Sequence, residues 1–241
     1  MRNETIAPDR WLIPSYQVLS RTDDSAALVM LEVPPGLSVD DIYDGGHIAV
    51  SLGRGVEAPT SYFAIFAVDR RRSALTLYVK RSVRGVVSSA LLDGSRHLYL
   101  AKPSAGISLP ERAERPLFIA AGSGLASGVG LVRRWLLQDP SSSPRASFLF
   151  VGRSGECRTV HLAMQQLELP VDLQLWDTIK RRRRADAGDL QAVLGAVQPD
   201  WIYVCGPADF ARLVRDSASS MQASPAVVAE CYEAPLEPAL P

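Results

Sequence analysis

An apolar segment that breaks into alternating glycines, near the middle of the chain, constrains the fold more than any other feature. Residues 116–128 read Pro-Leu-Phe-Ile-Ala-Ala-Gly-Ser-Gly-Leu-Ala-Ser-Gly and pass directly into a helical pattern. This order predicts a buried parallel strand, a tight turn and a helix N-terminus, whose unpaired N–H groups and positive dipole end favour a phosphate. Gly122 and Gly124 let the backbone turn sharply and approach a ligand, because no Cβ intervenes. The motif alone is compatible with phosphate binding and with plain strand–helix packing.

A second strand-like segment, further along the chain, also ends at a glycine. Residues 201–207 read Trp-Ile-Tyr-Val-Cys-Gly-Pro, and a helical pattern follows. Pro207 suits the first turn of a helix, where its missing N–H costs no hydrogen bond. We therefore expect Cys205 and Gly206 at the carboxyl end of a parallel strand, where open α/β sheets bind ligands. A cysteine buried as a small hydrophobic residue is the alternative.

Composition argues against several classes of protein. The 241 residues include 26 basic and 26 acidic side chains, so the formal net charge is zero. The charge therefore gives no indication of binding to nucleic acid or to an anionic membrane. The three cysteines form no CxxC pair, which argues against a disulfide framework, a zinc site or an iron–sulfur cluster. The three histidines share no common spacing, so no metal site is expected. The sequence shows no signal core and no transmembrane window, and we expect a cytoplasmic protein.

Up to about residue 110 the apolar residues come in short runs separated by turn residues, which is typical of an antiparallel barrel. One short helix, Val87–Leu92, is expected before the last run. Residues 1–110 are therefore predicted to form a barrel of six antiparallel strands: Tyr16–Leu19, Ala26–Val33, His47–Leu52, Ser61–Val68, Ala74–Lys80 and His97–Ala101.

From Pro116 onward strand and helix patterns alternate, which predicts a doubly wound parallel sheet of five strands in residues 111–232. Residues 102–115 are expected to connect the two domains, and residues 233–241 to be disordered. The expected strands are Leu117–Ala120, Ser147–Val151, Val171–Trp176, Trp201–Cys205 and Val227–Cys231. The expected helices are Leu125–Gln138, Thr159–Leu167, Asp189–Val197 and Ala208–Met221.

A barrel followed by this α/β domain resembles the ferredoxin–NADP reductase superfamily, over roughly residues 15–232. The resemblance implies that the barrel holds a flavin, usually FAD, and that the second domain holds NADPH or NADH. It also implies that hydride passes from the nicotinamide to the flavin and that single electrons continue to a partner protein.

Several positions of the second domain match the nucleotide motifs of that family. The resemblance implies that Cys205 orients the nicotinamide as a catalytic residue. It also implies that Glu230, in the ending Glu-Cys-Tyr, lies near the flavin ring with a catalytic role. The residues implied to contact the dinucleotide are Gly122, Ser123, Gly124, Leu125, Arg153, Cys205, Gly206 and Pro207.

Residues 75–88 resemble the family's strand and Gly-x-x-Ser element, which starts a short helix at the FAD pyrophosphate. The helix amides would hold the anion, with Ser88 as N-cap or as hydroxyl donor. The implied FAD contacts in this element are Lys80, Arg81, Gly85, Val86, Val87 and Ser88.

The chain departs from the family at the Arg-x-Tyr-Ser/Thr motif beside the flavin ring. Thr60 stands in the arginine position and Phe63 in the hydroxyl position, while Tyr62 keeps the aromatic residue. The resemblance implies that Tyr62 and Phe63 contact the flavin, with Tyr62 also catalytic. Loss of the arginine removes a charge-assisted contact to phosphate. Candidates to supply that charge are Lys80, Arg81 and Arg84.

The run Lys-Arg-Arg-Arg-Arg at residues 180–184 allows two interpretations. It is a solvated loop, as most short charge runs are. Alternatively it recognises the 2′-phosphate of NADPH, because it follows the third strand of the second domain, and Thr178 and Arg181 are then the best placed residues.

These features together predict a flavin-dependent NAD(P)H oxidoreductase that passes hydride to FAD and electrons on to a separate redox protein or a small molecule. The cofactors carry the redox chemistry and the protein aligns them. Two alternatives remain open. One is a flavin-free scaffold with a non-redox role on a small molecule, and the other is a regulatory subunit that senses NAD(P)H.

Overall fold

The structure, a computed structural model, describes residues 9–23, 25–82, 85–94, 97–138 and 146–232. The chain divides into two compact units, Met1–Ser108 and Leu109–Pro241. The tail expected to be disordered, residues 233–241, lies outside the described residues. Within the described ranges, no helix is both long enough and apolar enough to cross a membrane.

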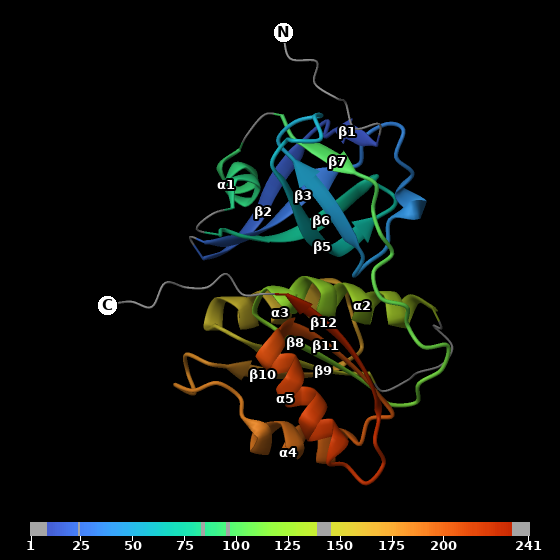
Figure 1. Cartoon of the computed structure of the whole chain (residues 1–241), viewed down its shortest axis with the longest axis vertical. Helices are drawn as coiled ribbons and strands as arrows, with labels where there is room; N and C mark the ends of the chain where they lie inside the picture. Colours follow the sequence, from blue (N-terminus) through green and yellow to red (C-terminus); the bar gives the residue numbers. More distant parts are fainter. Residues whose placement is uncertain (1–8, 24, 83–84, 95–96, 139–145, 233–241) are drawn as a thin grey trace. The chain divides into compact units, whose positions relative to one another are not determined.

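The first unit is built on an antiparallel sheet of seven strands in the order β1-β7-β4-β5-β6-β3-β2 (Figure 1). The antiparallel architecture is confirmed, but the sheet has one strand more than the six expected. The additional strand is β1, whose three residues pair with β7 and are too few to show an alternating pattern. The strands are β1 Arg10–Leu12, β2 Tyr16–Asp23, β3 Ala26–Glu32, β4 His47–Ser51, β5 Thr60–Asp69, β6 Ala74–Lys80 and β7 Tyr99–Ala101.

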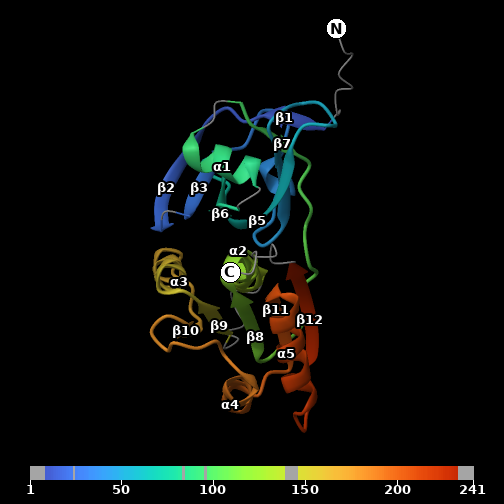
Figure 2. The same ribbon diagram turned by 60° about the vertical axis from the view of Figure 1, so that its left-hand side comes forward.

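Alternating side chains of these strands form the core of the first unit. Val29 and Leu31 of β3 and Leu77 of β6 are fully buried, as period-2 strands with one face on a core require. Helix α1, Val86–Asp93, lies against β3 and β6 (Figure 2) and adds Leu91 and Leu92 to the same core. It extends one residue beyond the expected helix at each end.

The second unit is a parallel sheet of five strands in the order β10-β9-β8-β11-β12, with α2 and α3 on one face and α4 and α5 on the other (Figure 1). This doubly wound fold is confirmed. The strands are β8 Pro116–Ala121, β9 Ser147–Gly152, β10 Asp172–Asp177, β11 Trp201–Pro207 and β12 Ala226–Tyr232. The α-helices are α2 Leu125–Gln138, α3 Ser154–Gln166, α4 Ala187–Val197 and α5 Ala208–Ser219.

Helix α3 begins at Ser154, five residues before the expected start at Thr159. Its first turn is polar, so apolar periodicity does not reveal it. The turn is stabilised because Arg153 donates its backbone N–H to the Glu156 carboxylate at 2.9 Å.

The strand order places a topological switch point between β8 and β11, where the winding of the sheet reverses. Loops leave these neighbouring strands toward opposite faces, which opens a crevice at their carboxyl ends. Both sequence motifs with glycine, after β8 and at the end of β11, lie at this edge.

Candidate functional site

The glycine turn after β8 packs directly against the end of β11. Gly122 has φ +55°, a left-handed conformation that favours glycine. A Cβ on Gly124 would lie 2.5 Å from the carbonyl oxygen of Cys205. On Gly128 it would lie 2.8 Å from the Cβ of Ala120. The three glycines thus serve the turn, its contact with β11 and the packing of α2 on β8, respectively.

The hydroxyl of Tyr232, the last residue of β12, lies inside this turn. It donates to the carbonyl of Ala121 and accepts the N–H of Gly124 at 3.3 Å. Burial raises the pKa of Tyr232 to about 12, although hydrogen bonds from Ser123 and Gly124 act in the opposite direction. The phenol is therefore un-ionised and part of the turn. Sequence analysis did not identify it as a site residue.

Cys205 lies in a buried polar cluster beside the turn. Burial, and then the charge of Glu230, raise the pKa of the thiol to about 12, while hydrogen bonds with Tyr203 and Ser127 oppose that shift. Tyr203 donates its hydroxyl to the Glu230 carboxylate at 2.5 Å. Glu230 and Cys205 are paired in register on β12 and β11. The thiol is 2% exposed and neutral, and a neutral thiol is a poor nucleophile.

The carboxyl ends of β9 and β10 carry a second polar cluster. Ser154, at the start of α3, donates its hydroxyl to Asp177 at 2.7 Å. This bond lowers the pKa of Asp177, and the N–H groups of Lys180 and Ile179 act in the same direction. Thr178 donates both its N–H and its hydroxyl to the carbonyl of Gly152. A charged carboxylate therefore marks the end of β10, whereas the Thr178 hydroxyl is engaged by the backbone.

The basic run that follows β10 is partly ordered by specific contacts. The guanidinium carbon of Arg181 lies 4.0 Å from the ring centroid of Trp176, and that of Arg183 lies 4.7 Å from it. Arg183 also forms ion pairs with Asp186 and Asp189. Because Trp176 and Asp177 are successive strand residues, their side chains point to opposite faces. Arg181 is thus held on the face away from the Asp177 carboxylate.

In the first unit, the start of α1 departs from one expectation. Gly85 is the N-cap, so the prediction of Ser88 as N-cap is wrong. Ser88 is 4% exposed, and its hydroxyl donates to the Gly85 carbonyl at 2.9 Å and accepts the Ser82 N–H at 3.4 Å. The Ser88 hydroxyl is therefore engaged in hydrogen bonds within the protein. The backbone N–H groups at Val86 and Val87 remain the groups that suit an anion.

The predicted flavin-ring residues lie on β5. Tyr62 is 79% exposed, whereas Phe63 packs against the core of the unit. At Thr60, which stands in the family's arginine position, the side chain accepts a hydrogen bond from Arg10 at 3.2 Å. Arg10 also donates to the carbonyls of Gly53 and Gly55, at 2.9 and 2.8 Å. A guanidinium from β1 therefore reaches this position.

The other candidate cations are placed differently. Arg81 forms a two-bond ion pair with Asp93, at 3.1 and 2.6 Å, which raises the pKa of Arg81. Lys80, at the end of β6, lies near Asp23 and contributes to lowering the pKa of that carboxyl. Arg84 lies outside the described residues. The guanidinium of Arg81 is thus paired with Asp93, whereas that of Arg10 lies at the Thr60 position.

The predicted residues therefore gather in separate places. Gly122, Ser123, Gly124 and Leu125 meet Cys205, Gly206, Pro207 and Glu230 at the carboxyl ends of β8, β11 and β12. Arg153, Thr178 and Arg181 lie at the ends of β9 and β10. In the part of the chain that the structure describes, no three His, Cys, Asp or Glu side chains form a metal-binding group.

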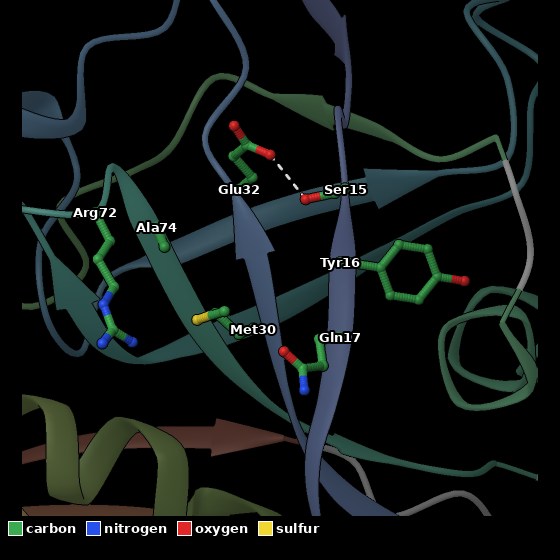
Figure 3. Close-up of a pocket in the computed structure, with 7 residues that line it drawn as sticks. All are labelled: Ser15, Tyr16, Gln17, Met30, Glu32, Arg72 and Ala74. Atoms are coloured by element: carbon green, nitrogen blue, oxygen red, sulfur yellow. Dashed lines mark hydrogen bonds between the residues drawn. The ribbon is translucent and has the colours of Figure 1, made fainter.

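A hollow on the surface of the first unit contains none of these residues (Figure 3). Glu32 accepts a hydrogen bond from the Ser15 hydroxyl at 2.7 Å on its wall. The ring of Tyr16 points away from these two, toward α1, where its hydroxyl donates to the carbonyl of Ala90 at 3.4 Å. The hollow is lined by Ser15, Tyr16, Gln17, Met30, Glu32, Arg72 and Ala74.

Comparison with solved structures shows extensive similarity in fold. The flavohem-like FAD/NAD binding domain of nitric oxide dioxygenase from Vibrio cholerae is 19% identical, with a TM-score of 0.67 over 94% of this chain and 99% of that one. Ferredoxin-NADP+ reductase from Plasmodium falciparum is 13% identical, with a TM-score of 0.64 over 92% of this chain and 95% of that one. These likenesses confirm a ferredoxin–NADP reductase-like fold.

A longer protein contains the same fold as one of its parts. An intact type IV self-sufficient cytochrome P450 monooxygenase is 17% identical, with a TM-score of 0.66 over 92% of this chain and 28% of that one. The chain thus spans less than a third of that monooxygenase. No protein-family model and no curated protein matches the chain.

Proposed function

We propose that the chain is a flavin-dependent oxidoreductase, which passes hydride from NAD(P)H to FAD and electrons on to an acceptor. The observation that carries this proposal is the glycine turn at the switch point, packed against the Cys205 end of β11. Helix N-terminal amides and a ligand crevice coincide there, as in dinucleotide-binding sheets. The similarity in fold to FAD- and NAD-binding reductase domains supports the same function.

In this proposal the turn Gly122–Leu125 binds the dinucleotide pyrophosphate, and the nicotinamide lies beside Cys205 and Gly206. The amides of Gly122 and Ser123 are the donors proposed for the phosphate, because the Gly124 N–H donates to the Tyr232 hydroxyl and the Leu125 N–H donates within the turn. Gly206 packs closely on its neighbours, since a Cβ there would lie 3.1 Å from Phe210 and from Ala121. The neutral Cys205 thiol is buried, so it packs beneath the surface on which the ring lies and supports the orientation of the ring from within the protein. Glu230, held by the Tyr203 hydroxyl, places a carboxyl group next to the thiol. The bound flavin supplies the redox chemistry, and the protein supplies alignment.

We propose NADH as the preferred donor. A carboxylate at the end of β10 would accept a hydrogen bond from a ribose hydroxyl and would repel a 2′-phosphate. Asp177 is the last residue of β10, and its hydrogen bond from Ser154 favours the charged form. The alternative reader of a 2′-phosphate, Arg181, is stacked on Trp176 instead.

For the flavin, the residues present in the first unit fit an anion at two positions. The first turn of α1 offers backbone N–H groups after Gly85, where a Cβ would clash with the Ser88 hydroxyl. Arg10 offers guanidinium donors beyond the three hydrogen bonds that it makes. We propose that these groups hold the FAD pyrophosphate. The electron acceptor is proposed to be a separate redox protein or a small molecule.

One observation favours the flavin-free scaffold as a second candidate. Phe63 takes the place of the hydroxyl residue at the flavin ring and is partly buried against the core, while Arg81 forms an ion pair with Asp93. Two groups expected to contact a flavin are thus occupied within the protein.

Titration of the purified protein, with FAD and with NADH separately, distinguishes the two candidates. The oxidoreductase proposal expects saturable binding of both, followed by quenching of flavin fluorescence and by calorimetry. Absence of FAD and FMN binding would favour the scaffold. If neither the flavins nor NADH binds, the oxidoreductase proposal fails.

A further inference from the structure

A hydrogen-bonded cluster of side chains lies between α2 and the strands β11 and β12. Tyr203 and Cys205 alternate along β11, and Glu230 is paired with Cys205 in register on β12, so the three side chains share one face of the sheet. Ser127 of α2 is hydrogen-bonded to Cys205 on that face. Tyr203 is 0% and Cys205 2% exposed, whereas Glu230 is only partly buried. The carboxylate is therefore the part of this cluster that reaches toward the surface.

The hydrogen bonds of the cluster converge on the carboxylate. Tyr203 donates its hydroxyl to Glu230 at 2.5 Å. Burial, followed by the charges of Cys205 and Glu230, raises the pKa of Tyr203 well above its usual value, so the phenol keeps the proton that it donates. For Cys205, where burial is again the largest cause of the raised pKa, the hydrogen bond with Glu230 acts in the same direction and that with Ser127 in the opposite one. A thiol that donates to a carboxylate and accepts from a hydroxyl has this combination.

We infer that Tyr203 is a positioning residue, whose hydroxyl holds the Glu230 carboxylate where it receives the thiol hydrogen of Cys205. This inference deepens the function proposed above and rests on it. The bond from the phenol fixes the rotation of the carboxylate, and the carboxylate fixes the direction of the S–H group. The sulfur beneath the proposed nicotinamide surface is thereby held in one orientation, although the fully buried phenol contacts neither cofactor.

Tyr203 is suited to this role because its own position is fixed. It lies in β11, which is paired with β8 on one side and with β12 on the other. Its ring centroid lies 6.3 Å from that of Phe118, its neighbour in register on β8. Glu230, by contrast, lies on β12, an edge strand among the described strands of the sheet, so its partly buried carboxylate gains order from a fixed donor. A phenylalanine would fill the same space in the core, which makes the bond to Glu230 the contribution of the hydroxyl.

The test is the substitution Tyr203→Phe, which removes the hydroxyl and keeps the ring. The infrared S–H stretching band of Cys205, identified by its absence in Cys205→Ala, is expected to move to higher frequency, because the thiol loses its fixed acceptor. In the FAD-loaded protein, the limiting rate of flavin reduction by NADH is expected to fall about tenfold, less than the roughly hundredfold that a misplacement of about 1 Å costs. The Kd of ADP-ribose, which lacks nicotinamide, is expected to stay unchanged. Tyr99→Phe removes a phenol from β7 of the other unit and is the matched control, with no expected change.

Glu230→Ala provides the background that separates positioning from packing. If Tyr203 acts through Glu230, Tyr203→Phe causes no further loss of rate once the carboxylate is removed, whereas a loss through core packing would persist. An unshifted S–H band, an unchanged limiting rate, or equal losses of rate in the two backgrounds would overturn the inference.

A second variant covers the case in which Tyr203→Phe does not fold, as judged by circular dichroism. Glu230→Asp withdraws the carboxylate from the phenol and the thiol by one methylene, and it is expected to shift the S–H band of Cys205 in the same direction. Failure of the unmodified chain to bind FAD, or to be reduced by NADH, would instead refute the proposed function. The infrared band, which needs no cofactor, would then still decide whether Tyr203 positions the thiol.

Discussion

Substitution of Gly124 by alanine tests whether the glycine turn is packed on β11 as the structure shows. The new Cβ would lie 2.5 Å from the Cys205 carbonyl oxygen and 2.9 Å from its carbon, both backbone atoms. Ordinary van der Waals contact begins at 3.4 Å, so the turn must retreat from β11 by roughly 1 Å. Overpacking of this kind costs about 1–3 kcal/mol. A displacement of about 1 Å in a site also costs up to about a hundredfold in function.

Gly195→Ala is the matched control for this substitution. Gly195 is an exposed residue inside α4, and a Cβ there meets nothing within 4 Å. Replacement of a helical glycine by alanine stabilises by about 0.5–1 kcal/mol, because the unfolded chain loses conformational freedom. The same chemical change is therefore expected to have opposite effects on stability at the two positions.

Scanning calorimetry gives the stability of each variant. Each kcal/mol corresponds to about 2–4 °C in the Tm of a chain of this size. We expect Gly124→Ala to lower the Tm of the second unit and to weaken NADH binding more than tenfold. Gly195→Ala is expected to raise the Tm and leave binding unchanged. A Gly124→Ala variant as stable as the unmodified chain would refute the packing argument.

Three further predictions address the nucleotide, the flavin and the thiols. Asp177→Asn is expected to abolish a preference for NADH over NADPH of about tenfold, measured as the ratio of Kd values; equal Kd values in the unmodified chain would contradict the assignment. Arg10→Gln is expected to weaken FAD binding about tenfold without changing NADH binding, and an unchanged FAD titration would remove Arg10 from the site. Iodoacetamide at about pH 8 is expected to modify the exposed Cys231 only, because burial raises the pKa of Cys157 to about 11 and that of Cys205 to about 12; labelling of Cys205 at a similar rate would contradict its burial.

Much of the fold was predictable because its signals are local. Helix α2 covers Leu125–Gln138, residue for residue as its apolar periodicity predicts. Each expected strand of the second unit lies within one residue or two of the observed bounds. By contrast, β1 has three residues and pairs with three residues of β7, which is too short for any periodic signal.

The residues of the candidate site were predictable only where a single continuous segment of the chain forms that part of the site. The glycine turn is such a segment, whereas its contact with Tyr232 joins residues 108 positions apart. The hydrogen bond from Arg10 to Thr60 spans 50 positions, and no local pattern predicts it. The ion pair of Arg81 with Asp93 likewise depends on how α1 packs on the sheet. Such contacts follow from tertiary structure. Sequence patterns therefore identified the candidate cations, but not which of them already form hydrogen bonds or ion pairs within the protein.

Anaerobic reduction of the FAD-loaded protein by NADH tests the central claim most directly. The visible absorption band of the bound flavin is followed by stopped-flow spectrophotometry. Hydride transfer predicts a loss of this band at a rate that saturates with NADH, and Gly124→Ala is expected to require much higher NADH. A flavin band that persists in saturating NADH, with both nucleotides bound, would contradict the account.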